Sequence, residues 1–281
     1  IYRLDVFMPQ ELINFFNNKN INDDFIRNLI LEYVTIHVKI FGNVISFDEI
    51  IDRLNDNLNF IVLVNPSKSF GTLVGQYEGF DKNTITMYFT RQDLESTLLR
   101  EEYIKVFFHE LTHSIYAIKQ EDKSEKQIFG TYIKLDDGTT PIIDGNFVYM
   151  EAIVNYVASQ IYGKKNGIYP AQTSNITKLA NLLDKEKIIR SAFDSEEENF
   201  KKCFSALSNG AYEYFTEGMS WLNTPGTYSY HAGSRIMTNF FQGIIPVNVR
   251  THGEFKNLDN RIKPLNIKQV SFEHDNICKR Q

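Results

Sequence analysis

The stretch YIKVFFHELTHSIYAIKQ, residues 103 to 120, decides the fold because it places His109, Glu110 and His113 inside an apolar helical pattern. Residues four apart on a helix lie one above the other, so both imidazoles project from one face and can reach the same divalent ion. Glu110 lies about 100° around the helix from His109 and can reach a water molecule beside that ion. This HExxH pattern predicts zinc-assisted hydrolysis, with Glu110 as general base and then general acid.

Apolar residues surround these three positions on the expected helix. They are Ile104, Phe107, Phe108, Leu111, Ile115 and Ile118. Their spacing predicts a largely buried helix. Buried imidazole and carboxylate groups are costly unless they are paired or bound to metal. Metal binding is therefore favoured over the alternative, two core histidines with only local hydrogen bonds.

Two histidines do not complete a catalytic zinc site, which usually has three protein ligands and one position for water. Residue 119 is Lys, so the chain lacks the histidine six positions after His113 that marks one zinc-protease class. Glu151, on the next predicted helix, is the best candidate, and Asn155 shares its helix face. Asn155 can accept an outer hydrogen bond from a ligand imidazole. The competing acids are Asp144, Glu125 and Asp137.

The hydrophobic periodicity predicts an α+β fold with a small mixed sheet, a metal helix and a mostly helical C-terminal lobe. Ser46 and Glu49 fit a capping box, Asn22 or Asp23 can cap the preceding helix, and Gly163 suits a helix stop. His37 lies in a predicted helix without a partner at ligand spacing, which favours a core or boundary role. Residues 121–126 read as a solvated linker, followed by a hairpin that turns at Asp137-Gly138.

The expected organisation is one catalytic domain spanning residues 1–281. Its parts are N-terminal helices at 1–58, the sheet and metal helix at 59–120, a hairpin and the third-ligand helix at 121–163, a helical lobe at 164–245 and an irregular tail at 246–281. The first residue is Ile rather than Met, which suggests a processed or excised domain with an attachment to further domains.

Composition excludes several functional classes. A net charge of -5 argues against a dedicated nucleic-acid binder, and no apolar run is long enough for a membrane span. The two cysteines are too few for a disulfide scaffold. Cys203 is expected to be a packed free thiol, and Cys278 either an inert tail thiol, which is favoured, or a link to another chain.

At HELTH and MEAIVNY the chain resembles the gluzincins, thermolysin-like zinc peptidases with HExxH followed by a glutamate helix. The resemblance implies a zincin-like fold, zinc ligands at His109, His113 and Glu151, and Glu110 as base. Asn155 departs from the usual ExxxD, and the gap before Glu151 is longer than in thermolysin. The segment GQYEGFDKNTITMYF resembles the edge-strand region that binds extended substrate in many zinc peptidases.

A gluzincin also needs a donor for the oxyanion, and Tyr149, Tyr228, Tyr230 and His231 are the candidates. HELTH is also similar to the HELIH of clostridial neurotoxin light chains, but only 108 residues precede it and their Arg-x-x-Tyr has no counterpart. A distant relation to toxin or effector zinc proteases fits the composition and favours a secreted or translocated protein.

The predicted function is a zinc metalloprotease that cuts internal bonds of a protein or peptide substrate. One alternative is a metal-binding effector, weakly active or inactive, that acts through a protein-binding surface. The other is a helical interaction domain in which HELTH is accidental.

Overall fold

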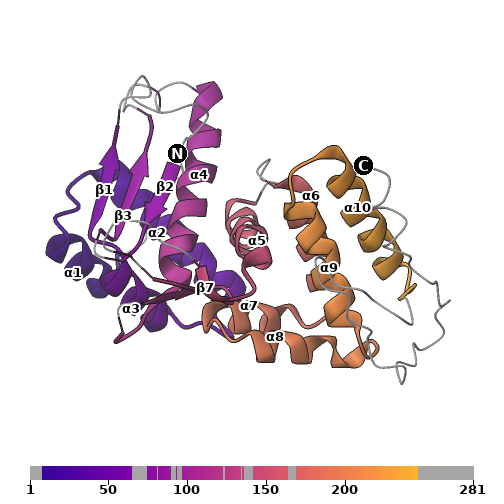
Figure 1. Cartoon of the computed structure of the whole chain (residues 1–281). Helices are drawn as coiled ribbons and strands as arrows, with labels where there is room; N and C mark the ends of the chain where they lie inside the picture. Colours follow the sequence, from indigo (N-terminus) through magenta and orange to yellow (C-terminus); the bar gives the residue numbers. More distant parts are fainter. Residues whose placement is uncertain are drawn as a thin grey trace. The chain divides into compact units, whose positions relative to one another are not determined.

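The computed structural model describes residues 8–64, 75–80, 82–89, 93, 97–122, 124–133, 135, 142–163 and 169–245. The chain is α+β, as the sequence predicts (Figure 1). The expected tail at 246–281, Cys278 and the Asp137-Gly138 turn lie outside the described residues.

The helices are α1 Gln10–Asn18, α2 Asp24–Phe41, α3 Phe47–Asn57, α4 Thr97–Tyr116, α5 Met150–Tyr162, α6 Pro170–Leu182, α7 Lys185–Phe193, α8 Glu197–Cys203, α9 Ala211–Asn223 and α10 Thr227–Phe241, with 3-10 turns η3 Phe147–Tyr149 and η4 Phe204–Ala206. The strands are β1 Phe60–Leu63, β2 Gly75–Glu78, β3 Thr84–Met87, β4 Ala117–Lys119, β5 Glu125–Gln127, β6 Gly130–Tyr132 and β7 Ile142–Gly145.

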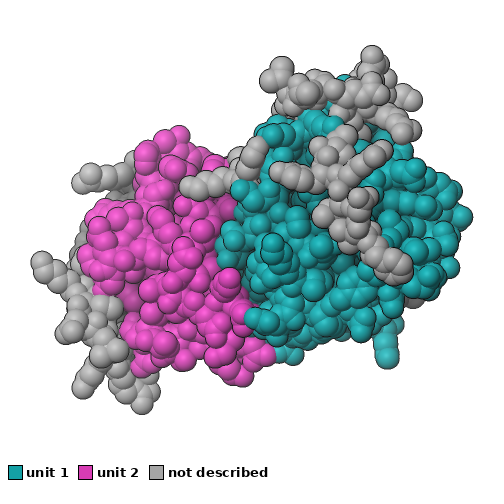
Figure 2. All heavy atoms as spheres, turned by 180° about the vertical axis from the view of Figure 1, so that it is seen from behind, with its two compact units in different colours: residues 1–168, 189–196 teal, residues 169–188, 197–281 magenta. Residues whose placement is uncertain are grey.

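The chain divides into two compact units (Figure 2). Unit 1 comprises residues 1–168 and 189–196, and unit 2 comprises residues 169–188 and 197–281. Unit 2 contains most of the residues expected in the helical C-terminal lobe at 164–245, whereas the second half of α7 and the turn after it belong to unit 1. In unit 2, helix α9 packs against α10 and α6, and the rings of Phe204, Phe215 and Phe240 contact one another in its core.

The first sheet is mixed, as predicted, with the strand order β1-β3-β2. Strand β1 pairs parallel to β3, with Phe60 opposite Thr84, and β2 pairs antiparallel to β3, with Tyr77 opposite Ile85. Ile85 and Met87 of β3 are buried in the core. Strand β2 is an edge strand within the described part of this sheet, and α4 packs beside it (Figure 1).

Helix α4 ends earlier than its periodicity predicts. The sequence predicts a helix through Gln120, but α4 ends at Tyr116 and residues 117–119 form β4. Side chains from other elements bind the carbonyl groups at this end: Asn57 donates to Ser114 O and Ala117 O, and Arg53 also donates to Ala117 O. These bonds satisfy carbonyls that a helix end leaves without intrahelical partners. The predicted end at Gln120 was wrong because the contacts that end the helix come from α3, which is distant in sequence and leaves no trace in the local periodicity.

The prediction of a solvated linker at residues 121–126 is also wrong for the last residues of that segment. Ser124 and Glu125 are buried, and Glu125 begins β5 of a four-stranded antiparallel sheet with the order β4-β5-β6-β7. The Glu125 carboxylate accepts a hydrogen bond from Phe80 N at 3.0 Å. A polar side chain can therefore leave solvent when a backbone N–H replaces water as its partner.

The predicted helix signals agree with the structure. Asp23 caps α2 by accepting bonds from the backbone of Phe25 and Ile26, and Ser46 forms the capping box of α3 with Glu49. Gly163 ends α5 with a φ of 75°, in the left-handed region that favours glycine. Within the described ranges, no helix is long and apolar enough to cross a membrane.

Helix α2 supports α4 through buried polar contacts. Tyr33 donates to Thr112 Oγ1 at 2.8 Å, and Thr112 donates to the carbonyl of Phe108. One turn further on, His37 Nε2 lies 3.2 Å from the hydroxyl of Tyr116. His37 is fully buried, which confirms the predicted core role, and burial lowers its pKa to about 3.

We expect His37 to make the protein less stable in acid. In the unfolded chain its pKa is 6.5, so the unfolded state binds the proton first as the pH falls. The stabilising contribution is complete above pH 6.5 and is lost progressively toward the folded pKa of about 3. Between pH 7.5 and 5.5 this loss is about 1.4 kcal/mol.

Urea denaturation of the parent and of His37→Gln at pH 7.5 and 5.5 measures the free energy of unfolding that is lost between these pH values. Glutamine retains a hydrogen-bonding amide but does not titrate. With a chelator present in all samples, the parent should lose about 1.4 kcal/mol more than the variant. Equal losses in the two proteins would show that His37 is protonated in the folded state.

Candidate metal centre

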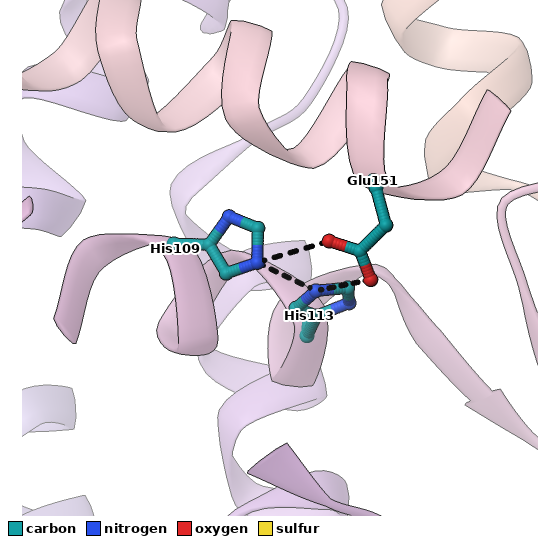
Figure 3. Close-up of side chains that lie close together, drawn as sticks. All are labelled: His109, His113 and Glu151. Atoms are coloured by element: carbon teal, nitrogen blue, oxygen red, sulfur yellow. Dashed lines mark hydrogen bonds and ion pairs between the residues drawn. The ribbon is translucent and has the colours of Figure 1, made fainter. Parts of the chain in front are cut away.

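Helices α4 and α5 bring His109, His113 and Glu151 together (Figure 3). His109 Nε2 lies 3.0 Å from His113 Nε2 and 3.2 Å from Glu151 Oε2, and His113 Nε2 lies 3.6 Å from Glu151 Oε1. All three come from unit 1. The two imidazoles lie one turn apart on α4, and Glu151 lies in the first turn of α5. This group could hold a metal ion.

The distances between these atoms fit a small tetrahedral cation. An ion with bonds of about 2.0 to 2.2 Å to nitrogen and oxygen holds its ligands about 3.3 to 3.6 Å apart, close to the 3.0, 3.2 and 3.6 Å observed. The side chains of His109 and His113 are 6% and 8% exposed, whereas the Glu151 side chain is 29% exposed. The group is therefore buried on the α4 side and reaches solvent at Glu151.

The charges of the group reinforce one another. Burial alone would raise the pKa of Glu151, but the imidazoles of His113 and His109 hold it well below its usual value. Burial alone would lower the pKa of His113, but the carboxylates of Glu151 and then Glu110 raise it. Glu151 is thus held as a carboxylate, the form that can bind a cation.

Asn155 occupies the predicted outer position. Its Oδ1 lies 3.0 Å from Nδ1 of His109, and the side chain is completely buried one turn after Glu151. Because the amide oxygen only accepts hydrogen bonds, this contact assigns the His109 proton to Nδ1. The Nε2 lone pair is then directed toward Glu151 and His113, where a metal would bind.

Glu110 lies beside His109 on α4 but is not one of the converging group. Its Oε2 accepts a hydrogen bond from the backbone N–H of Tyr77 at 2.7 Å, and the residue is buried. Tyr77 belongs to β2, so the carboxylate lies between the metal helix and the edge strand. The sequence suggests a strand near Glu110 but not this bond.

The competing third ligands have different positions. Glu125 is buried and its charge acts on His113, but its carboxylate binds Phe80 N instead of joining the converging atoms. Asp144 lies in β7 with its side chain outside the described part of the structure, and Asp137 is not described at all. Among the described acids, Glu151 therefore has the geometry of a ligand.

The four candidate oxyanion donors differ in exposure. Tyr149 is fully buried with its ring against Phe129. Tyr228, Tyr230 and His231 lie exposed on α10 of unit 2. Their assignment as donors remains a prediction.

Sequence reasoning missed Tyr132 and Gln127 of the second sheet. The Tyr132 hydroxyl donates to Met150 Sδ at 3.0 Å, and Met150 immediately precedes Glu151 in the chain. Burial, and then the charges of Glu151 and Glu125, raise its pKa to about 12, so the phenol keeps its proton at neutral pH. Gln127 donates to the carbonyl of His113 at 2.7 Å. Strand pairing places both residues, and the local sequence carries no signal for them.

We expect the ligands and the outer contact to differ in their effects on metal affinity. His109→Ala, His113→Ala and Glu151→Ala should each abolish stoichiometric zinc binding, because two ligands remain. Asn155→Ala should weaken binding by about 10- to 100-fold, because it removes only the bond that orients His109. Zinc titration with a competing chelator measures this order.

Glu125→Gln is the matched control, since Glu125 is a buried carboxylate near the site that the structure leaves outside the ligand group. It should bind zinc within about threefold of the parent. A thermal melt of each variant separates lost affinity from lost folding. Parent-like zinc affinity in Glu151→Ala, together with loss in Asp144→Ala, would contradict the assignment of the third ligand.

No family model, no curated protein and no solved structure matches this chain. A fold alone does not define an activity, because function resides in particular sites. Function is therefore inferred from the geometry of this metal centre.

Proposed function

We propose that the chain is a gluzincin-type zinc metallopeptidase with a zincin-like fold, and that it cuts internal peptide bonds of a protein substrate. The observation that carries the proposal is the convergence of His109, His113 and Glu151 beside Glu110. The order of an edge strand β2, a helix α4 with both histidines and a helix α5 with the third ligand supports it.

The donor set favours zinc over harder cations. Two imidazoles and one carboxylate form one of the usual catalytic zinc sites, whereas calcium and magnesium prefer oxygen ligands alone. When bound, zinc would supply a Lewis acid that polarises a carbonyl and lowers the pKa of water. The protein ligands would be His109, His113 and Glu151, with Asn155 orienting His109.

Glu110 is the proton-transfer group in this proposal. It would take a proton from the attacking water at its carboxylate and pass it to the leaving amine. Its Oε2 is held by Tyr77 N, while neighbouring His109 and His113 face the ligand group. The base is thus fixed by a backbone donor.

An extended peptide fits the edge of the first sheet. Strand β2 is an edge within the described residues. Its Tyr77 N–H is taken by Glu110, and an added strand would bond to the remaining outward-facing main-chain groups with little demand on sequence. This arrangement supports a protein or peptide substrate. A secreted or translocated setting remains a prediction from composition.

Tyr132 joins the candidates for oxyanion stabilisation. It is half-buried on β6, its hydroxyl lies at Met150 next to Glu151, and it stays protonated at neutral pH. A neutral phenol donates a hydrogen bond without adding charge to the site. Preorganised donors of this kind stabilise charge that develops in the transition state.

Glu110→Gln tests the proposed function. The variant should keep one zinc per chain and the parent melting temperature, but lose peptidase activity by a factor of at least about 10³, because the base is removed. Denatured casein with mass-spectrometric mapping of cleavage sites supplies the substrate, and a quenched fluorescent peptide built on a mapped site supplies the rates.

Glu102→Gln is the matched control on the same helix, because Glu102 is an exposed glutamate that pairs with Lys105. It should cleave at the parent rate. Cleavage by Glu110→Gln at the parent rate would contradict the mechanism. A zinc-loaded parent that cleaves nothing would favour a metal-binding effector instead.

Tyr132→Phe tests the proposed donor. It retains the ring, so zinc affinity and thermal stability should stay near those of the parent, whereas kcat should fall by about 10²-fold with little change in KM. Tyr162→Phe, at the far end of α5, is the control and should leave kcat unchanged. An unchanged kcat in Tyr132→Phe would return the assignment to the other candidates.

A further inference from the structure

The backbone of β2 contacts the proposed base directly. In an antiparallel pair, successive residues alternate between bonding across the pair and pointing their N–H and C=O groups away. Tyr77 N–H points away from β3 and donates to Glu110 Oε2 at 2.7 Å. This distance is typical of a charge-assisted hydrogen bond, which is stronger than a bond between neutral groups.

Gly75 permits this close approach of strand and helix. A Cβ at residue 75 would lie 2.6 Å from Val106 Cγ1, 2.9 Å from Met87 Sδ and 3.2 Å from Glu110 Cγ. The first two distances are shorter than van der Waals contact allows, so a larger residue would force the Val106 and Met87 side chains, or β2 itself, to shift. The absence of a side chain at residue 75 therefore keeps Tyr77 N–H within reach of Glu110.

We propose that β2 is a positioning element for Glu110, in which Gly75 sets the distance between strand and helix and Tyr77 N–H fixes the carboxylate. This inference rests on the proposed function and adds residues that the HExxH pattern does not contain. A glutamate side chain is intrinsically free to rotate, and a misplacement of about 1 Å can cost about 10²-fold in rate. Fixing one oxygen leaves the other to orient water.

The hydrogen bond is tested by nuclear magnetic resonance, independently of activity. The zinc-loaded full chain is labelled with ¹⁵N-tyrosine, and Tyr77→Phe identifies the signal of residue 77 by removing it. That amide proton should resonate downfield in the parent. It should move upfield in Glu110→Gln, which retains a neutral acceptor, and further in Glu110→Ala, which has none.

The positioning role is tested by Gly75→Ala, Val106→Ala and the double variant. Gly75→Ala should keep its zinc, shift the Tyr77 amide upfield and lower kcat by about 10- to 100-fold, with KM within about threefold of the parent. Val106→Ala removes the closest colliding atom. The double variant should therefore regain most of the lost kcat. Glu102→Gln, an exposed change on α4 away from β2, is the control and should match the parent.

Two results would overturn the inference. A Tyr77 amide that does not respond to Glu110→Ala would show that the bond is absent, whatever the activity. A Gly75→Ala variant with a shifted amide but the parent kcat would show that the bond does not position the base. Failure of the proposed function can be told apart from failure of this inference, because the amide shift is measured without an activity assay. A parent protein without peptidase activity would contradict the proposed function, and its Tyr77 amide would still report whether the bond to Glu110 is present.

Discussion

The polar groups of α4 must find partners away from water, and the neighbouring elements of unit 1 are arranged to supply them. Buried polar groups without partners cost free energy comparable to a lost hydrogen bond. Helix α2 binds Thr112 through Tyr33, α5 binds His109 through Asn155, and β2 binds Glu110. Further donors come from α3 and β5, which bind carbonyls in the last turns of the helix.

The same contacts hold His109, His113 and Glu151, the candidate metal ligands, in one geometry. Asn155 orients the His109 ring, and Gln127 binds the carbonyl of His113 without blocking its imidazole. Rigid outer contacts raise metal affinity because little ordering remains to be done when the ion binds. Glu151 is the more exposed ligand, so the buried helix supplies the rigid part of the site and α5 closes it toward solvent.

The two sheets have different roles around α4. The first brings a backbone N–H to Glu110, and the second places the side chains of Glu125, Gln127 and Tyr132 around His113 and Met150. The tip of the β5–β6 hairpin carries positive φ angles at Ile128 and Phe129, which are costly for these residues. Burial of both side chains offsets this cost and keeps the hairpin in place.

Sequence alone determined what depends on neighbours within a helical turn or two. The HExxH spacing, the Ser46–Glu49 capping box and the pairing of Glu151 with Asn155 on one face all follow from a fixed helical repeat. Tertiary structure decided the end of α4 at Tyr116, the burial of Glu125, and the approach of Tyr77 N–H and Tyr132 to the site. These features depend on strand pairing and on contacts between residues 18 to 64 positions apart. The local sequence pattern does not indicate which distant group will replace water as the partner of a buried polar group.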